Sequence, residues 1–366
     1  MSSVLDGRAI VYCQDSFRTT NGKTAHGLVR KTRRYDVLSV IDRTCVGNDA
    51  GFLLDGVAKN IPFHPDLRTA IQEARDRGQP AEYLVIGLAP DGGRMDSQTR
   101  QTVLEALQAG LNVDAGLHDF LSDIPEFVEL AQQQNVRLRD VRKTPARSEL
   151  HAFSGKIDEV DSFRVAVLGT DSAVGKRTTS WCLVDGFLDQ GLSAEMVGTG
   201  QTAWMQGARF SIILDSLIND FVAGELEHAV WSAWRETSCD VVVVEGQGSL
   251  MHPAYPGGFE ILAATKPHVI VLQHAPARTE YDGFPGQLLD PLAKQIEALR
   301  LISGKPVVAI TINHENLSPD ETRAACATIE RETGIPTTDV LLEGPGRLVS
   351  VLMSHLNEAR DRGRRP

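Results

Sequence analysis

The segment from Val165 to Thr179 reads VAVLGTDSAVGKRTT, and it constrains the fold more than any other stretch of the chain. A short apolar run, a glycine-rich turn and then Gly-Lys predict a strand, a phosphate-binding loop and a helix. Glycines in the turn let backbone N–H groups converge on phosphate oxygens, because no Cβ stands in the way. We therefore predict a site for a phosphate-bearing ligand, in which Lys176 supplies a positive charge. Its predicted residues are Gly169, Thr170, Asp171, Ser172, Ala173, Val174, Gly175, Lys176, Arg177 and Thr178.

One position in this loop differs from the pattern of nucleotide hydrolases. Those enzymes carry Ser or Thr directly after the lysine, and its hydroxyl holds Mg²⁺. Here Arg177 occupies that position, and hydroxyl groups follow at Thr178 and Thr179. The loop therefore predicts phosphate binding more firmly than it predicts Mg-ATP, and the sequence assigns no metal ligand.

Composition narrows the class of protein. A chain of 366 residues with 42% hydrophobic and 23% charged residues is typical of a globular enzyme of about two domains. Its net charge of −11 disfavours non-specific binding to nucleic acid or to an anionic membrane. No apolar stretch reaches the roughly 20 residues of a membrane helix, and no signal-peptide pattern is present. Five scattered cysteines without a CxxC pair fit reduced thiols, so we expect a cytoplasmic protein.

Residues 1–142 predict an N-terminal α/β domain. Short β-branched runs alternate with helical spacing of apolar residues, which is typical of a parallel sheet covered on both faces. The expected strands are Ala9–Cys13, Asp36–Ile41, Tyr83–Ala89 and Val136–Val141. The expected helices are Asp66–Arg77, Ser97–Ala109 and Pro125–Asn135. A dinucleotide site is not predicted here, because no GxGxxG pattern occurs between a strand and a helix.

Residues 143–162 are polar and without periodicity, as expected of a linker, and residues 163–366 resume the strand–helix alternation as a P-loop domain. Functional loops are expected at the carboxyl ends of its parallel strands. The expected strands are Arg164–Leu168, Ala194–Gly198, Val241–Val244, His268–Gln273 and Val307–Ile312. The expected helices are Lys176–Gln190, Asp215–Phe221, Glu225–Thr237, Pro291–Arg300 and Pro319–Glu332.

A carboxylate in the sequence VVVVEGQGSL is the second candidate for chemistry. Four valines predict a central strand, and Glu245 follows at its carboxyl end. A carboxylate there is placed to face the phosphate loop and to hold Mg²⁺ directly or through water. The structural alternative is a carboxylate that caps a helix or stabilises a turn.

Three other loops at strand ends carry polar side chains. They follow the strands that end near Gly198, Gln273 and Ile312. Arg278 is suited to clamp a substrate carboxylate through its planar fork. His274, Glu280 and Asp282 remain alternatives for a base, and Asn313 either reads an adenine base or caps the next turn. The predicted substrate-binding residues are Gln201, Thr202, Gln247, His274, Arg278 and Tyr281.

Several motifs resemble known families. GTDSAVGK, VEGQG and INHENL, in this order, are similar to dethiobiotin synthetase, a nucleotide-dependent ligase of the P-loop class, over residues 163–366 only. A broader resemblance spans nearly the whole chain. Asn48–Gly51, GLAPDGGRM, GLHDFL, GTDSAVGKRTT, GTGQT, DFVAGELE, VEGQGSL and HAPAR resemble a family of unknown function that joins a Rossmann-like domain to a P-loop domain. The Gly-Lys-Arg-Thr order looks like that family's own variant, which accounts for Arg177.

The resemblance implies an activity, because the family contains a D-glutamate N-acetyltransferase that uses acetyl-CoA. It implies acetyl transfer to the amino group of D-glutamate or a similar acidic amino acid, and it implies a homo-oligomer. Coenzyme A carries phosphates that a P-loop can bind without Mg²⁺. Under this hypothesis Glu245 is the base, Arg278 the carboxylate clamp and Gly246–Gly248 the oxyanion donors. The expected catalytic residues are Glu245, Lys176 and Arg278.

Two other classes of function remain open. One is an ATP- and Mg-dependent ligase that activates a carboxylate, with Lys176 on the phosphates, Glu245 and Thr178 on Mg²⁺, and Asn313 on adenine. Arg177 disfavours it, whereas VEGQG and INHENL favour it. The other class is a nucleotide-sensing regulatory protein without turnover.

Overall fold

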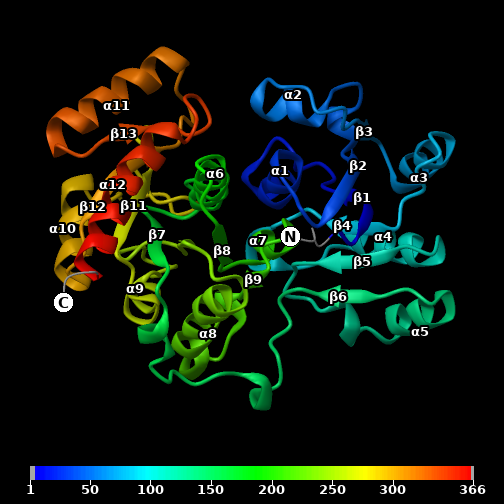
Figure 1. Cartoon of the computed structure of the whole chain (residues 1–366). Helices are drawn as coiled ribbons and strands as arrows, with labels where there is room; N and C mark the ends of the chain where they lie inside the picture. Colours follow the sequence, from blue (N-terminus) through cyan, green and yellow to red (C-terminus); the bar gives the residue numbers. More distant parts are fainter. Residues whose placement is uncertain (1–4, 364–366) are drawn as a thin grey trace. The chain divides into compact units, whose positions relative to one another are not determined.

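The computed structural model describes residues 5–363 and contains two compact units. The N-terminal unit comprises Met1–Pro145 together with Gln201–Ala208, and the C-terminal unit comprises Ala146–Gly200 and Arg209–Pro366. Each unit is built on one parallel sheet (Figure 1). Two parallel α/β domains, Rossmann-like and P-loop, confirm the predicted fold class.

The N-terminal sheet has six strands in the order β3-β2-β1-β4-β5-β6, and every neighbouring pair is parallel. This order reverses between β1 and β4, which is the Rossmann arrangement. The strands are β1 (Gly7–Tyr12), β2 (Tyr35–Ile41), β3 (Phe63–His64), β4 (Tyr83–Ile86), β5 (Asn112–Ala115) and β6 (Leu138–Asp140). Neither β3 nor β5 was predicted, because a two-residue strand and the short run NVDA carry too little pattern.

Helices of the N-terminal unit pack on this sheet around one hydrophobic core. Met205 of α7 is fully buried in that core, although 55 residues of the other unit precede Gln201 in the chain. The helices are α1 (Lys23–Arg30), α2 (Ala50–Asp55), α3 (Leu67–Asp76), α4 (Ser97–Gln108), α5 (Pro125–Gln134) and α7 (Gln201–Met205).

The C-terminal sheet has seven parallel strands in the order β13-β12-β11-β7-β10-β8-β9. The chain builds β8 to β10 on one side of β7 and then crosses to β11 on the other side. The topological switch point is therefore at β7, where α/β sheets bind their ligands. The strands are β7 (Phe163–Gly169), β8 (Ala194–Gly198), β9 (Phe210–Ser211), β10 (Val241–Glu245), β11 (Val269–His274), β12 (Val307–Ile312) and β13 (Thr337–Thr338).

Helices cover both faces of the C-terminal sheet, as its largely apolar, buried central strands require. Helices α8 and α9 lie on the opposite face from α6 (Figure 1). Val242 and Val244 pack with α8, whereas the alternate residues of β10, including Glu245, point to the other face. The helices are α6 (Lys176–Asp189), α8 (Asn219–Thr237), α9 (Phe259–Thr265), α10 (Leu292–Ser303), α11 (Pro319–Thr333) and α12 (Gly346–Gly363).

The two helices predicted over Asp215–Phe221 and Glu225–Thr237 are wrong as separate elements. The structure has one continuous helix, α8, after a short 3₁₀ turn. Gly224 lies inside this helix, and a Cβ there would come within 2.0 Å of the carbonyl oxygen of His151. The glycine therefore permits close packing of a neighbouring segment and does not end the helix.

The predicted linker, residues 143–162, divides between the two units. Its last part packs on α8, where the Glu227 carboxylate accepts the backbone N–H groups of Ser154 at 2.6 Å and Ile157 at 3.1 Å. The side chain of Ile157 is fully buried. Within residues 5–363, no helix combines the length and hydropathy that crossing a bilayer requires.

Candidate functional site

The phosphate-binding loop lies between β7 and α6, at the topological switch point of the C-terminal sheet. Ala173 and Gly175 have φ values of 51° and 109°, so the loop uses left-handed backbone to turn into the helix. Gly169 lacks a side chain because a Cβ would lie 2.9 Å from Cδ of Lys176. This strand–loop–helix geometry is the one that places backbone N–H groups and a helix N-terminus around an anion.

Lys176 connects this loop to the loop after β10. Its Nζ donates hydrogen bonds to the carbonyl oxygens of Asp171 at 2.7 Å and Gly248 at 2.9 Å. The side chain is buried, so its charge acts in a medium that screens weakly. Thr179 anchors the first turn of α6, because its hydroxyl donates to Oε1 of Gln273 at the end of β11 at 2.5 Å. The start of the helix is thus fixed from both neighbouring strands.

Asp171 organises the loop from within. Its side chain is fully buried and accepts the N–H groups of Ser172 at 2.6 Å and Asp282 at 3.0 Å. Nη1 of Arg278 donates to Oδ2 of the same carboxylate at 2.9 Å. The sequence suggested a ligand-binding role for Asp171. The structure shows that its carboxylate binds the protein's own donors, and thereby joins the phosphate loop to the loop after β11.

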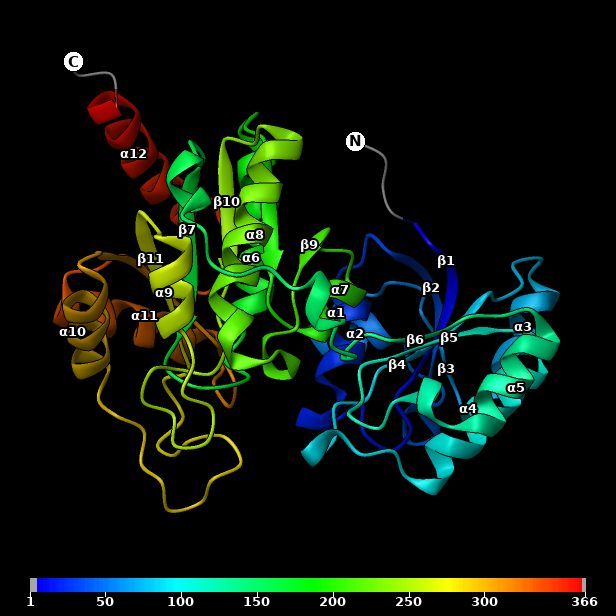
Figure 2. The ribbon, with the colours of Figure 1, turned by 90° about the horizontal axis from the view of Figure 1, so that it is seen from below.

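His252 was not predicted as a site residue. Its Nδ1 accepts the N–H groups of Ala254 at 3.1 Å and Tyr255 at 2.9 Å, so its proton lies on Nε2, which is 3.2 Å from Oδ1 of Asp171. Burial lowers the pKa of His252. The imidazole therefore caps the turn at Ala254 and Tyr255 and lies against Asp171, while its buried Nε2 has no hydrogen-bond partner among residues 5–363. Figure 2 shows the loops 246–258 and 275–291 extending side by side from one end of the sheet.

Arg278 is a buried cation with partners on both sides. Beside its bond to Asp171, Nη1 donates to the carbonyl oxygen of Ser172 at 2.9 Å, and Nη2 donates to Oε2 of Glu315 at 2.6 Å. These bonds use three of its five N–H donors. Burial acts to lower the pKa of Arg278, but the hydrogen bonds to Glu315 and Asp171 and the charges of Glu315 and Asp282 raise it overall. The carboxylate clamp predicted from sequence therefore holds carboxylates of this chain in the structure.

Glu245 ends β10 on the face that carries α6. It is buried, and Oε2 accepts the N–H of Thr199 at 2.9 Å. Burial raises the pKa of Glu245, while the charges of Arg177 and Lys176 and the Thr199 hydrogen bond act in the opposite direction. A carboxylate with a raised pKa beside cations is suited to take up a proton. The position at a strand end, predicted from VVVVEGQGSL, is present in the structure.

The loop after β10 contains the glycines that were expected to supply oxyanion donors. The N–H of Gly246 donates to the carbonyl oxygen of Val167 at 2.9 Å, so it extends the pairing of β10 with β7 at the carboxyl end of the sheet. Gly246 has no room for a side chain, because a Cβ would lie 2.5 Å from that same oxygen. Nε2 of Gln247 donates to the carbonyl oxygen of Thr199 at 2.6 Å, which ties the loops after β8 and β10 together.

Polar residues at and after the ends of β11 and β12 also have partners within the protein. Nδ1 of His274 lies 2.9 Å from the hydroxyl of Thr170, and burial lowers the pKa of His274 to about 4. The hydroxyl of Tyr281 donates to the carbonyl oxygen of Met251 at 3.2 Å. Asn313 accepts the N–H of Glu315 through Oδ1 at 3.1 Å, which is the turn-capping role considered from the sequence. Each of these contacts stabilises a loop at the rim of the site.

Gln201 and Thr202 belong to the N-terminal unit, whereas the other predicted site residues belong to the C-terminal unit. The hydroxyl of Thr202 is 2.8 Å from that of Thr24, and both side chains are buried. Gln201 packs closely on Gly116. A Cβ on Gly116 would lie 2.6 Å from Cγ of Gln201. These contacts give both residues structural roles within that unit.

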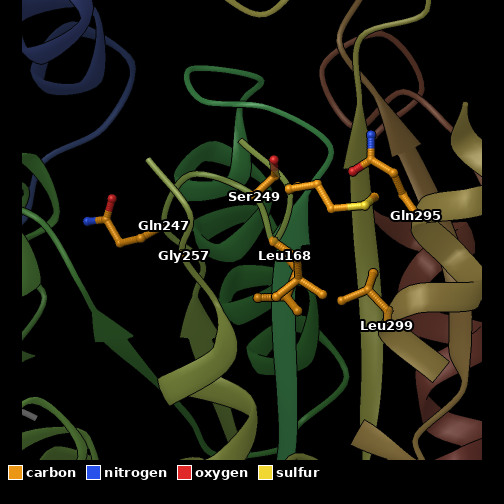
Figure 3. A pocket seen from close by; sticks show the side chains of 9 residues that line it. Leu168, Gln247, Ser249, Gly257, Gln295 and Leu299 are labelled. Carbon is orange, nitrogen blue, oxygen red and sulfur yellow. The ribbon is translucent and has the colours of Figure 1, made fainter. Parts of the chain in front are cut away.

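A small pocket adjoins the phosphate loop on the side of α10 (Figure 3). Leu168 and Leu299 form part of its apolar wall, and the amide of Gln247 points away from both. Ser249 lines it and was not predicted. Its buried hydroxyl has no hydrogen-bond partner among residues 5–363. The remaining lining residues are Gly169, Leu250, Met251, Gly257 and Gln295.

Family comparisons cover both halves of the chain. Residues 151–349 match a family described as "Domain of unknown function (DUF1611_C) P-loop domain". Residues 43–144 match "Domain of unknown function (DUF1611_N) Rossmann-like domain". The crystal structure of a DUF1611 family protein from Anabaena variabilis is 30% identical and superposes with a TM-score of 0.86, over 95% of this chain and 99% of that one.

Two curated relatives carry an activity in their names. A D-glutamate N-acetyltransferase of Pseudoalteromonas is 31% identical over 280 residues, which is 74% of this chain and 81% of the relative. A D-glutamate N-acetyltransferase of Tritonibacter scottomollicae is 29% identical over 288 residues, covering 77% of this chain and 84% of the relative. Both matches extend beyond the length of either domain alone.

Proposed function

The chain belongs to the DUF1611 family, and we propose that it transfers an acetyl group from acetyl-CoA to the amino group of D-glutamate or a similar acidic amino acid. The observation that carries this proposal is the intact phosphate loop at the switch point, with Glu245 at the end of the neighbouring strand. The relatives named D-glutamate N-acetyltransferase support acyl transfer as the reaction class. We also propose a cytoplasmic homo-oligomer.

The phosphate loop would bind phosphates of coenzyme A. Backbone N–H groups and Lys176 supply the positive potential, and Arg177 adds a second cation where Mg-dependent enzymes have a hydroxyl. Cations at this position neutralise phosphate charge without a metal ion. The sequence departure at Arg177 is therefore consistent with a coenzyme that keeps its phosphates throughout the reaction.

Glu245 is the proposed base. Its carboxylate takes one proton from the substrate ammonium, and the amine lone pair then attacks the thioester carbon. The carbonyl π electrons move to oxygen, return as the C–S bond breaks, and leave an amide and a thiolate. The second proton from nitrogen neutralises that thiolate, so the products are the N-acetyl amino acid and free coenzyme A. A raised pKa suits Glu245 to the first step.

Mg-ATP chemistry is the second candidate, because the β7–α6 loop and Glu245 have the arrangement of a nucleotide site. In that case the protein would activate a carboxylate as dethiobiotin synthetase does. Thr178 and Glu245 would hold Mg²⁺, and Asn313 would contact adenine. Arg177 is half-buried at the start of α6, where Mg-dependent enzymes carry a hydroxyl, and this candidate does not explain it.

One assay separates these candidates. The purified protein is incubated with D-glutamate and acetyl-CoA, and separately with Mg-ATP and a panel of amino acids, while free thiol and ADP are measured. Thiol release that requires D-glutamate is the expected result. ADP formation without thiol release would refute acetyl transfer, and silence in both reactions would favour a sensor protein.

A further inference from the structure

The two carboxylates bound by Arg278 differ in their surroundings. Asp171 is fully buried and receives further hydrogen bonds from backbone N–H groups, so it is a permanent partner. The side chain of Glu315 is 39% exposed, although its Oε2 lies 2.6 Å from Nη2 of Arg278. Arg278 itself is only 8% exposed in its side chain. The guanidinium therefore has one internal partner and one partner at the solvent side of the site.

Glu315 occupies a short loop that follows β12 at the same end of the sheet as the phosphate loop. Asn313 Oδ1 holds the backbone N–H of Glu315 at 3.1 Å, and Asn316 has a φ of 59°. The backbone is thus fixed, while the carboxylate reaches the arginine through a flexible side chain. Because the Glu315 side chain is partly exposed, water can solvate its carboxylate when it leaves the arginine.

From this geometry we infer that Glu315 occupies the place of a substrate carboxylate on Arg278 and must leave it when an acidic amino acid binds. The inference rests on the proposed function for the identity of the substrate class, a dicarboxylic amino acid. Nη2 presents the charge that a side-chain or α-carboxylate of such a substrate requires. Glu315 therefore lowers the apparent affinity of the site for carboxylates, because each ligand must compete with it for Arg278.

Substitution of Glu315 gives the direct test. Glu315→Ala removes the competing carboxylate, so the KM for D-glutamate should fall about fivefold, which corresponds to the upper end of the range for exposed ion pairs. The kcat should stay within about twofold, because the reacting groups are unchanged. A purely structural Glu315 would give the opposite result, with a raised KM for D-glutamate and a lower melting temperature.

A matched control and a coupled variant separate this effect from a change in net charge. Asp320→Asn removes one negative charge from the exposed first turn of α11, where Asp320 pairs with Arg323 in its own helix, and should leave KM unchanged. In an Arg278→Lys background, Glu315→Ala should no longer lower KM, since the fork that both carboxylates share is absent. An unchanged fivefold gain in that background would overturn the inference.

Ligand binding distinguishes failure of this inference from failure of the proposed function. Glutarate and its uncharged diamide are titrated into the wild type and Glu315→Ala by calorimetry, without acetyl-CoA. Tighter binding of glutarate alone to the variant supports the displacement of Glu315, even if no thiol is released in the activity assay. Equal or weaker glutarate binding to the variant would refute it, whether or not the protein is an acetyltransferase.

Discussion

Nη1 of Arg278 lies 2.9 Å from Oδ2 of Asp171, and this buried ion pair joins two loops that are 107 residues apart in the chain. Asp171 belongs to the phosphate loop after β7, and Arg278 belongs to the loop after β11. Because the same carboxylate also accepts the N–H of Ser172, the arginine fixes the backbone conformation that an anion would meet. The conformation of the phosphate loop therefore depends on Arg278 in the loop after β11.

Removal of this arginine should cost both stability and coenzyme affinity. Arg278→Ala leaves the buried Asp171 carboxylate without its cation, and loss of one member of a buried pair typically costs about 3–5 kcal/mol. Chemical denaturation measures that loss. Arg323→Ala is the control, because its pair with Asp320 is exposed and contributes about 0–1 kcal/mol. Equal losses in the two variants would show that the buried pair does not hold the loop.

Lys176→Ala should weaken acetyl-CoA binding strongly. The variant loses the cation of the phosphate loop and both hydrogen bonds that connect Asp171 and Gly248. A charged hydrogen bond from Nζ to a phosphate oxygen would contribute about 1.5–3 kcal/mol, so a drop in affinity of about 10- to 100-fold is expected by calorimetry. Lys294→Ala, which removes an exposed lysine on α10, should bind normally. An unchanged affinity of Lys176→Ala would place the coenzyme phosphates elsewhere.

Glu245→Gln should abolish the base while preserving coenzyme binding. The kcat should fall by about 10²- to 10⁴-fold. In the wild type, kcat/KM should fall on acidification at a pH above the usual Glu pKa of 4.5, because burial raises the pKa of Glu245. A kcat within threefold of the wild type would assign the proton transfer to another group.

The same substitution has a predicted effect on stability with a definite sign. The pKa of Glu245 in the folded protein lies above its unfolded value, so its protonated form favours the fold. Its contribution is fully present below the unfolded pKa and is lost as the pH rises through the folded pKa. Glutamine stays neutral and avoids that loss, so at pH 7 the variant should melt at a higher temperature than the wild type. A lower melting temperature would mean that the ionised form is the stable one.

Local sequence patterns were sufficient to predict the strand, loop and helix around Lys176, because the strand, the glycine turn and the lysine are contiguous in the chain. The end of β10 at Glu245 was equally predictable from four successive valines. The partners of these residues were not. His252 and Glu315 meet Asp171 and Arg278 only through the order of strands in the sheet, and no local pattern encodes that order.

The N-terminal placement of Gln201 and Thr202 shows the same limit. The motif GTGQT follows a strand end and therefore resembles a ligand loop, yet its last residues begin α7 in the other unit. Thr202 finds its partner in Thr24, 178 residues earlier. Polarity and position after a strand did not reveal that the chain enters the other unit here, and the substrate-binding role of Gln201 and Thr202 stays a prediction.

Acid should destabilise the protein through His274. Burial lowers the pKa of His274 from 6.5 to about 4, so the folded protein holds this imidazole neutral while the unfolded chain protonates it. Its contribution is complete above pH 6.5 and is lost as the pH falls towards 4, by about 3 kcal/mol at most, since each pKa unit corresponds to about 1.4 kcal/mol. His274→Gln should therefore flatten the decline in unfolding free energy measured by denaturation between pH 7 and pH 4.5. His355→Gln, on α12, should retain the full decline, and an identical pH dependence in His274→Gln and the wild type would refute this assignment.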